Sequence, residues 1–375
     1  MHVLIAPDRF SGPLNAVQAA RALASGWAET VPTDRLSLLP MSDGAAGLLD
    51  VVMAARGGSL VPVSADGPLG APTVAAVLHV PGDGGGTAYV EADQVLGTHL
   101  VPRERAHAAK DGSSAGLAAL LEAAVATNAG RIVVGLPTVA ATHDGGRGLL
   151  GALGGATAAR EVLARRDLVL AVADDLPLLG LHGAGALLGE DPDVGPALAQ
   201  ELERDLGAMT ADLERQAGPP PNPVLLSAGT EERHGRLASS PGSGAGGGVA
   251  FALRLLGARP MPGADVVAGA VGLAGAVARA DLVLTGSAVF DAPALTQSVV
   301  ATVARTALDR ALPVVVVAEE IRTSRREVAP LGISGTYEVQ DTSRLRPRLA
   351  APPAADLETA VRARARRLAR TWSTS

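Results

Sequence analysis

Aspartates in loops that follow short apolar runs could hold a metal ion or take a proton from a hydroxyl group. They are Asp8, Asp43, Asp144 and Asp291. Carboxylates suit both magnesium coordination and general-base chemistry, although an aspartate at the start of a helix can also simply cap that helix. Asp43 and Asp144, each followed by glycine, allow all three roles. His143 beside Asp144 is by itself only a weak sign of a metal site or a base.

A glycine-rich stretch, SSPGSGAGGGVAFALRLLG at residues 239–257, could cradle a phosphate. Glycines let a backbone approach a ligand closely, and the helix that follows would turn free N–H groups toward an anion. The glycine spacing formally matches a dinucleotide fingerprint, but no strand precedes it, and the chain has no Walker-type loop. A flexible loop without a ligand explains this stretch alone equally well.

The elements that must position these residues follow a regular pattern. Short β-rich runs alternate with alanine-rich segments, which predicts an α/β fold with a mostly parallel sheet between helices. Strands are expected at 3–6, 36–39, 131–135, 167–173, 280–286 and 312–318, and helices at 14–27, 44–55 and 353–372. Open α/β sheets bind ligands at the carboxyl ends of their strands, so the four aspartates and Thr285 are expected to converge.

The region from Gly58 to Val101 breaks this pattern. Shorter runs flank the turn PGDGGG, which predicts a hairpin and suggests that a second domain begins near residue 63. A chain of 375 residues is also long for one core. The proline-rich QAGPPPNP at residues 216–223 is interpreted as a loop rather than as a domain linker.

Composition excludes several classes of function. Aromatic residues make up 2% of the chain and the formal net charge is −6, so nucleic acid is not an expected partner. The absence of cysteine removes disulfides, thiol catalysis and cysteine-ligated metals. The chain opens with an apolar strand instead of a basic leader, and it has no uncharged apolar run of membrane length. We therefore expect a soluble cytoplasmic protein with no membrane partner.

In this order the motifs resemble the bacterial type I glycerate kinase family. That family typically has IAPDSFKxSLSA, MADGGEG, GGSATNDGGxG, PGAGAAGGLG, ADLVITGEGxxDxQS and PVIAIAG. The corresponding segments here are IAPDRFSGPLNA, MSDGAAG, LPTVAATHDGGRG, PGSGAGGGVA, ADLVLTGSAVFDAPAL and PVVVVAE, in collinear order from residue 3 to about residue 320.

The resemblance implies a Rossmann-like α/β domain, residues 1–62 and 280–375, interrupted by a second α/β domain, residues 63–279, with the active site in the cleft between them. It implies ATP and Mg²⁺ as cofactors and D-glycerate, or a closely related small hydroxy acid, as substrate. A homodimer is compatible with the sequence but not indicated by it.

The same resemblance assigns site residues position by position. It assigns catalytic roles to Asp43, Asp144 and Arg9, and metal binding to Asp8 and Asp291. Nucleotide binding falls to Gly242, Ser243, Gly244, Gly246, Gly247, Thr285 and Gly286.

The polar loops depart from the family pattern. SFK is replaced by RFS at residues 9–11, so the family lysine is missing and Arg9 is the nearest cation, with a different reach. The glutamate of GGEG is Ala46, GEG is GSA at residues 286–288, and GGSATN is rebuilt at residues 137–143. Near residue 190, GEDPDVGPA replaces the family's PQKGA. Two hypotheses fit: a kinase with shifted substrate or reduced activity, or a catalytically impaired paralogue that binds a ligand or partner.

Overall fold

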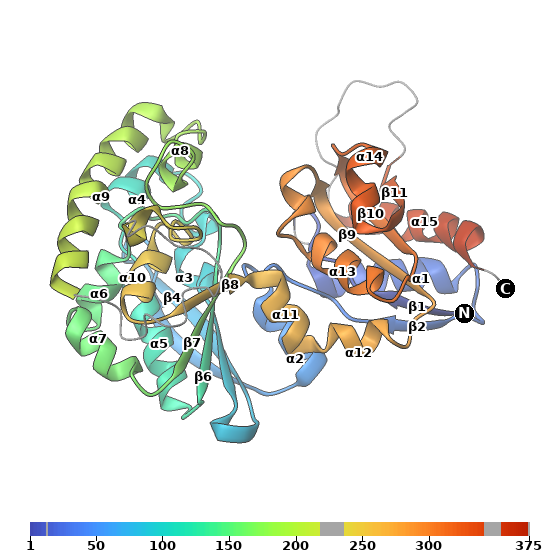
Figure 1. Ribbon diagram of the computed structural model, residues 1–375, viewed down its shortest axis with the longest axis horizontal. Helices are drawn as coiled ribbons and strands as arrows, with labels where there is room; N and C mark the ends of the chain where they lie inside the picture. Colours follow the sequence, from blue (N-terminus) through green and yellow to red (C-terminus); the bar gives the residue numbers. More distant parts are fainter. Residues whose placement is uncertain (13, 218–235, 341–353, 374–375) are drawn as a thin grey trace. The chain divides into compact units, whose positions relative to one another are not determined.

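The computed structural model describes residues 1–12, 14–217, 236–340 and 354–373. The chain divides into two compact units, each built of helices around its own sheet (Figure 1). Unit 1 contains residues 1–43, 50–57 and 264–375, and unit 2 contains residues 44–49 and 58–263. The two-domain α/β fold that the sequence predicts is confirmed.

The unit boundaries differ from the predicted ones after residues 62 and 279. The whole of β3 (Ser59–Asp66) pairs with β4 (Pro72–Val80), so unit 2 resumes at Gly58. At the other boundary, nearly all of α11 (Gly263–Val271) belongs to unit 1, where Thr302 donates a hydrogen bond to Asp265 at 2.7 Å. Apolar helices between two strands carry no sequence signal that tells which sheet they cover.

The sheet of unit 1 has five parallel strands in the order β11-β10-β9-β1-β2. Their bounds are β1 His2–Ile5, β2 Arg35–Leu38, β9 Leu282–Phe290, β10 Val314–Ile321 and β11 Ile333–Glu338. The apolar runs at Val3–Ile5 and Val314–Val317 are fully buried, because central parallel strands are covered on both faces. β9 extends four residues and β10 three residues beyond the predicted apolar runs, and the polar residues of these extensions are Ser287, Glu319 and Glu320.

Helices cover this sheet and complete its core. They are α1 Ala16–Ala28, α2 Leu48–Arg56, α11, α12 Leu273–Val277, α13 Val299–Leu308, α14 Arg325–Val328 and α15 Ala354–Trp372. α1 begins with a capping box, in which Asn15 and Gln18 satisfy each other's backbone N–H groups. α15 packs against α1, and Gly26 permits this close approach, since a Cβ atom there would lie 2.1 Å from the carbonyl oxygen of Arg362.

The sheet of unit 2 has six strands in the order β3-β4-β5-β6-β7-β8. The strands after β4 are β5 Thr87–Glu91, β6 Arg131–Leu136, β7 Asp167–Val172 and β8 Arg259–Pro262. β4 runs antiparallel to β3 and to β5, and its pairing with β5 confirms the predicted hairpin. The remaining pairs are parallel. Its helices are α3 Asp93–Leu96, α4 Arg105–Asp111, α5 Leu117–Ala126, α6 Arg147–Ala152, α7 Ala156–Leu163, α8 Ala184–Leu188, α9 Gly195–Ala217 and α10 Val249–Leu255.

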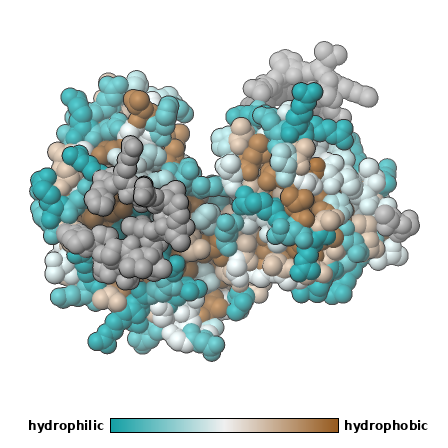
Figure 2. All heavy atoms as spheres, in the orientation of Figure 1, coloured by the Kyte–Doolittle hydropathy of each residue, from teal (hydrophilic) through white to brown (hydrophobic). Residues whose placement is uncertain are grey.

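The described surface is mixed in character. Figure 2 shows hydrophilic residues over much of the visible face of each unit, with hydrophobic residues between them in small groups. Among the described residues, no helix is both long enough and apolar enough to cross a membrane. Most of the proline-rich segment at residues 216–223 lies outside the described residues.

Candidate active site

The carboxyl ends of β1, β2 and β9 border one pocket within unit 1. β1 lies between β9 and β2 in the sheet, so the loops that leave these parallel strands come together. The pocket measures about 410 Å³ and is called the acidic pocket below. It is lined by Asp8, Arg9, Phe10, Ser11, Gly12, Asp43, Ser287, Ala288 and Val289.

Backbone hydrogen bonds hold the loop after β1 against the neighbouring strands. The Asp8 N–H donates to the carbonyl oxygen of Gly286 in β9 at 2.8 Å. The Ser11 N–H donates to the carboxylate of Glu319 in β10 at 2.5 Å. Between them the Phe10 ring is buried, and a Cβ atom at Gly286 would lie 3.1 Å from that ring. The loop that carries Asp8 and Arg9 is therefore anchored on two strands.

Asp43 reaches the pocket because the helix after it starts late. The predicted helix start at Gly44 is wrong: α2 begins at Leu48, and the intervening turns need positive φ at Gly44 (+93°) and Gly47 (+88°). The N–H groups of Gly47 and Leu49 at the start of α2 are instead bound by the carboxylate of Glu91, at 3.0 and 3.1 Å. Asp43 is thus not the cap of this helix, and it lines the acidic pocket.

The acidic pocket opposes the ionisation of Asp8. Burial raises the pKa of Asp8 well above its ordinary value, and the nearby charge of Asp43 raises it further. The backbone N–H and the charge of Arg9 offset this only in part. Two carboxylates that repel each other in one pocket gain strongly from a cation placed between them.

The donor set fits Mg²⁺ as a phosphate-bound ion. Mg²⁺ is usually held by one or two carboxylates together with water and substrate phosphates, which is what Asp8 and Asp43 could provide. In the described part of the chain, no group of three or more His, Cys, Asp or Glu side chains could hold a metal by itself. Mg²⁺ binding therefore stays a prediction that depends on a phosphorylated ligand.

Asp291 and Thr285 lie outside the lining of the acidic pocket. Asp291 follows the end of β9 and accepts the N–H of Ala294 at 3.2 Å. The Thr285 hydroxyl is buried and donates to the carbonyl oxygen of Ala6 at 2.8 Å, which ties β9 to β1. The expected convergence on this pocket therefore holds for Asp8 and Asp43, and the roles predicted for Thr285 and Asp291 stay predictions.

Asp144, in unit 2, is buried and fully engaged. Its Oδ1 accepts the N–H of Gly146 at 2.9 Å, and its Oδ2 accepts the N–H of Gly148 at 3.0 Å. Oδ2 also accepts the N–H and the hydroxyl of Ser114, at 2.9 and 2.8 Å. Both oxygens thus organise the start of α6. This is the capping role that the Asp-Gly pattern allows, and the catalytic role stays a prediction.

The glycine loop uses most of its N–H groups internally. The N–H groups of Gly242, Gly244 and Gly246 donate to the carbonyl oxygens of residues 175, 176 and 137, and that of Ser243 donates to residue 240. The Ser243 side chain is buried and bonded on both sides. The following helix, α10, has only seven residues. The phosphate-cradle role of this loop therefore stays a prediction, and the present conformation offers few free donors for it.

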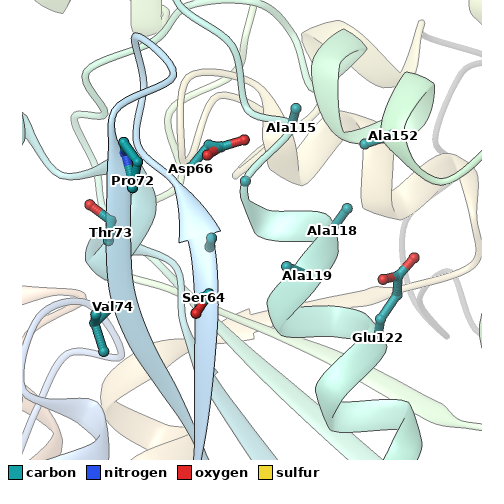
Figure 3. Close-up of a pocket in the computed structure, with 12 residues that line it drawn as sticks. Ser64, Asp66, Pro72, Thr73, Val74, Ala115, Ala118, Ala119, Glu122 and Ala152 are labelled. Atoms are coloured by element: carbon teal, nitrogen blue, oxygen red, sulfur yellow. The ribbon is translucent and has the colours of Figure 1, made fainter.

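Another cavity lies in unit 2 between β3, β4 and α5 and measures about 490 Å³ (Figure 3). Alanines of α5 and its neighbours form one wall, and Asp66 and Glu122 are the charged residues among its described lining. A cavity lined by two carboxylates and no cation does not suit a phosphorylated ligand. The acidic pocket, which has Arg9, is the better candidate.

Sequence reasoning did not single out Glu319 and Val289. Glu319 accepts a hydrogen bond from the loop that borders the acidic pocket, and Val289 lines that pocket. Each lies beyond the apolar core of its strand, and strand length past an apolar run has no clear sequence signal. The one available hint is the glutamate in PVVVVAE, where the resembling family has glycine.

Comparison with known proteins identifies a family that this chain matches over most of its length. The family described as the glycerate kinase family matches residues 3–161 and 156–373. A glycerate kinase of Halalkalibacterium halodurans is 30% identical over 363 residues, which cover 90% of each chain. An uncharacterized protein of Mycobacterium tuberculosis is 33% identical over 345 residues, which cover 91% of this chain and 84% of the relative.

A solved structure agrees with this relationship. The crystal structure of a putative glycerate kinase 2 from Salmonella typhimurium LT2 superposes with a TM-score of 0.74 at 25% identity. The match covers 99% of this chain and 98% of the other.

Proposed function

The chain belongs to the glycerate kinase family, and from this premise we propose that it transfers the terminal phosphoryl group of ATP to a hydroxyl of D-glycerate or a closely related small hydroxy acid. The observation that carries the proposal is the acidic pocket. Asp8, Asp43 and Arg9 line one space at the carboxyl ends of three parallel strands, where this fold class binds ligands.

This reaction requires neutralisation of phosphate charge and positioning of the two reactants, and it requires no covalent catalysis. Phosphoryl transfer passes through a loose transition state, so the protein mainly orients the reactants and neutralises charge. Mg²⁺, when bound with the nucleotide, would supply charge neutralisation on the phosphate oxygens, held by Asp8 and Asp43.

The same carboxylates suit the acceptor hydroxyl. A carboxylate that accepts the hydrogen bond of the attacking hydroxyl fixes its direction of approach. Asp43 would play this part beside an Asp8 that holds Mg²⁺, and it could receive the hydroxyl proton as the phosphoryl group moves. Arg9 is the only cation among the described lining residues of the pocket, and it would bind a phosphate oxygen.

The test is acceptor-dependent release of ADP from Mg-ATP, with D-glycerate against a blank without acceptor. Arg9→Ala should lower kcat/KM by about 10²-fold or more, as loss of a charge-stabilising donor does. Ser11→Ala should have little effect, because the structure uses the Ser11 backbone rather than its side chain at Glu319. Arg21→Ala, at an exposed position on α1, is the matched control.

The competing hypothesis is a catalytically impaired paralogue that binds a ligand or partner. It predicts no ADP release with D-glycerate or with other small hydroxy acids from a folded protein. Equal and small effects of Arg9→Ala and Ser11→Ala on a measurable turnover would instead retain the kinase and reject Arg9 as its phosphate-binding cation.

A further inference from the structure

The carboxylate of Glu319 reaches from β10 to the loop after β1. Its Oε1 accepts the N–H of Ser11 at 2.5 Å, although the two residues lie 308 positions apart in the chain. β10 and β1 are not neighbours in the sheet, because β9 lies between them. The hydrogen bond is therefore no part of a strand pairing, and it ties the loop to the far side of β9.

Arg9 lies in this loop between two fixed points. On one side, the Asp8 N–H donates to a carbonyl oxygen of β9 at 2.8 Å. On the other side is the hydrogen bond from Ser11 to Glu319, and the Phe10 ring between them is only 2% exposed. The Arg9 side chain itself is exposed and lines the acidic pocket. Its direction therefore depends on where these two hydrogen bonds hold its backbone.

The Glu319 carboxylate has no competing partner. Within the described part of the chain no cation pairs with it, whereas the next residue, Glu320, pairs with Arg322 at 2.8 Å. Glu319 is half-buried, directly after the fully buried residues 314–318 of β10. A carboxylate that loses part of its hydration must be stabilised by what it binds. The loop after β1 is therefore the part of the fold on which Glu319 acts.

Both ends of this contact depart from the motifs of the glycerate kinase family. Position 11 has serine instead of lysine, and position 319 has glutamate where the family has glycine. A glycine has no side chain that could reach the loop, so the motif pattern assigns no role to position 319. Together the two changes remove a flexible cation from the loop and add an acceptor that fixes the backbone beside Arg9.

We propose that Glu319 is a positioning residue, which holds the loop after β1 so that Arg9 can bind a phosphate group in the acidic pocket. This inference rests on the proposed function for the identity of the phosphate ligand. Glu319 is not among the described residues that line the pocket, so it acts through the loop and not on the ligand. A hydrogen bond to a charged acceptor is stronger than one to a neutral acceptor, which suits a contact that must hold an exposed loop.

The experiment is titration calorimetry of the full chain with Mg-ADP, which measures phosphate binding without turnover. Glu319→Ala removes the acceptor and should weaken Mg-ADP about 3- to 10-fold, as loss of one hydrogen bond does. Glu319→Gln keeps an acceptor oxygen and should bind Mg-ADP about as tightly as the wild type. Glu358→Ala, at an exposed position on α15, is the matched control and should not change the affinity.

Two further readouts separate positioning of Arg9 from a general effect on the fold. If Glu319 acts through Arg9, Glu319→Ala should change the Mg-ADP affinity by less than about 2-fold in a protein that already carries Arg9→Ala. Hydrogen exchange of the free protein, followed by mass spectrometry, tests the contact itself. The peptide that contains residues 8–12 should exchange faster in Glu319→Ala than in the wild type or in Glu319→Gln, and peptides from unit 2 should not change.

Several results would overturn the inference. Unchanged exchange of that peptide in Glu319→Ala would mean that the contact does not hold the loop. Unchanged or tighter Mg-ADP binding by Glu319→Ala would leave Glu319 at most a repelling charge, and additive effects of Glu319→Ala and Arg9→Ala would mean that it does not act through Arg9.

The outcome for the kinase is separate. Release of ADP with D-glycerate alongside any of these results would leave the kinase proposal standing. Weaker binding in Glu319→Ala that disappears in the Arg9→Ala protein, without ADP release, would reject the kinase and keep Glu319 as a positioning residue. A folded protein that binds no Mg-ADP would reject both.

Discussion

Asp8 shows how a single residue can work against the stability of its own unit. The pocket buries its carboxylate and places a second carboxylate nearby, and both effects favour the protonated form. A group whose pKa is raised on folding binds more protons folded than unfolded, so the free energy of unfolding falls as pH rises from its ordinary pKa through its raised pKa. Residues held in this way are typical of sites that trade stability for function.

The raised pKa of Asp8 gives a first prediction. In metal-free buffer at pH 7, Asp8→Asn should raise the thermal midpoint by a few degrees, because the amide has no charge to bury. Below the ordinary pKa of aspartate the gain should disappear, because the wild-type carboxyl is protonated in both states. Thermal melts across this pH range measure it, with the exposed Asp309→Asn on the end of α13 as control. Destabilisation at pH 7 would mean that the pocket favours the charged form.

The sequence could predict that Asp8 and Asp43 share a pocket, because the carboxyl ends of adjacent parallel strands meet. It could not predict which aspartates are already occupied. Oδ2 of Asp144 accepts the N–H and the hydroxyl of Ser114, a residue 30 positions away, and neither the spacing nor the Asp-Gly pattern reveals that partner.

Among the elements, α6 depends on this carboxylate for its start. Asp144→Asn leaves one acceptor oxygen where the wild type uses two, so buried N–H groups at Gly146 or Gly148 lose their partner. We expect the free energy of unfolding to fall by about 2 kcal/mol, measured by denaturant titration. Asp205→Asn, exposed on α9, should change it by less than about 0.5 kcal/mol. Unchanged stability with lost turnover would instead make Asp144 a group that acts in the reaction.

The crossing of α1 and α15 rests on one glycine. Gly26→Ala would place a Cβ atom 2.1 Å from the Arg362 carbonyl oxygen and 2.9 Å from the Ala365 Cβ. Forcing these helices apart should cost about 1–3 kcal/mol, seen as a lower urea midpoint with an unchanged slope. Gly269→Ala in α11, where a Cβ atom meets nothing within 4 Å, should raise the midpoint. A harmless Gly26→Ala would show that this contact does not limit the helix crossing.

Elements with strong apolar periodicity could be predicted closely, and the late start of α2 could not. The segment from Gly44 contains alanine and leucine at helical spacing, so propensity favours a helix there. Tertiary structure decides otherwise: Gly135 lies so close that its Cβ would be 1.9 Å from the carbonyl oxygen of Gly44, and Glu91 binds the N–H groups further on.

Over the whole molecule, the chain returns to its first sheet after building a second one. β1 and β2 come from the first 38 residues, and β9 to β11 come from residues 282–338, yet they form one parallel sheet. The order of apolar runs shows that strands alternate with helices, but it does not show which strands share a sheet. That assignment depends on long-range pairing such as that of Val3 with Leu282.

The measurement that tests the account most directly is ³¹P NMR of the full-length protein with ATP, Mg²⁺ and D-glycerate. The account predicts a new phosphomonoester signal that grows in step with ADP, needs D-glycerate, and is lost in Asp43→Asn but kept in Asp309→Asn. ATP that stays intact with D-glycerate and with related hydroxy acids, in a folded protein, would contradict it, as would ADP that forms without any new phosphate ester.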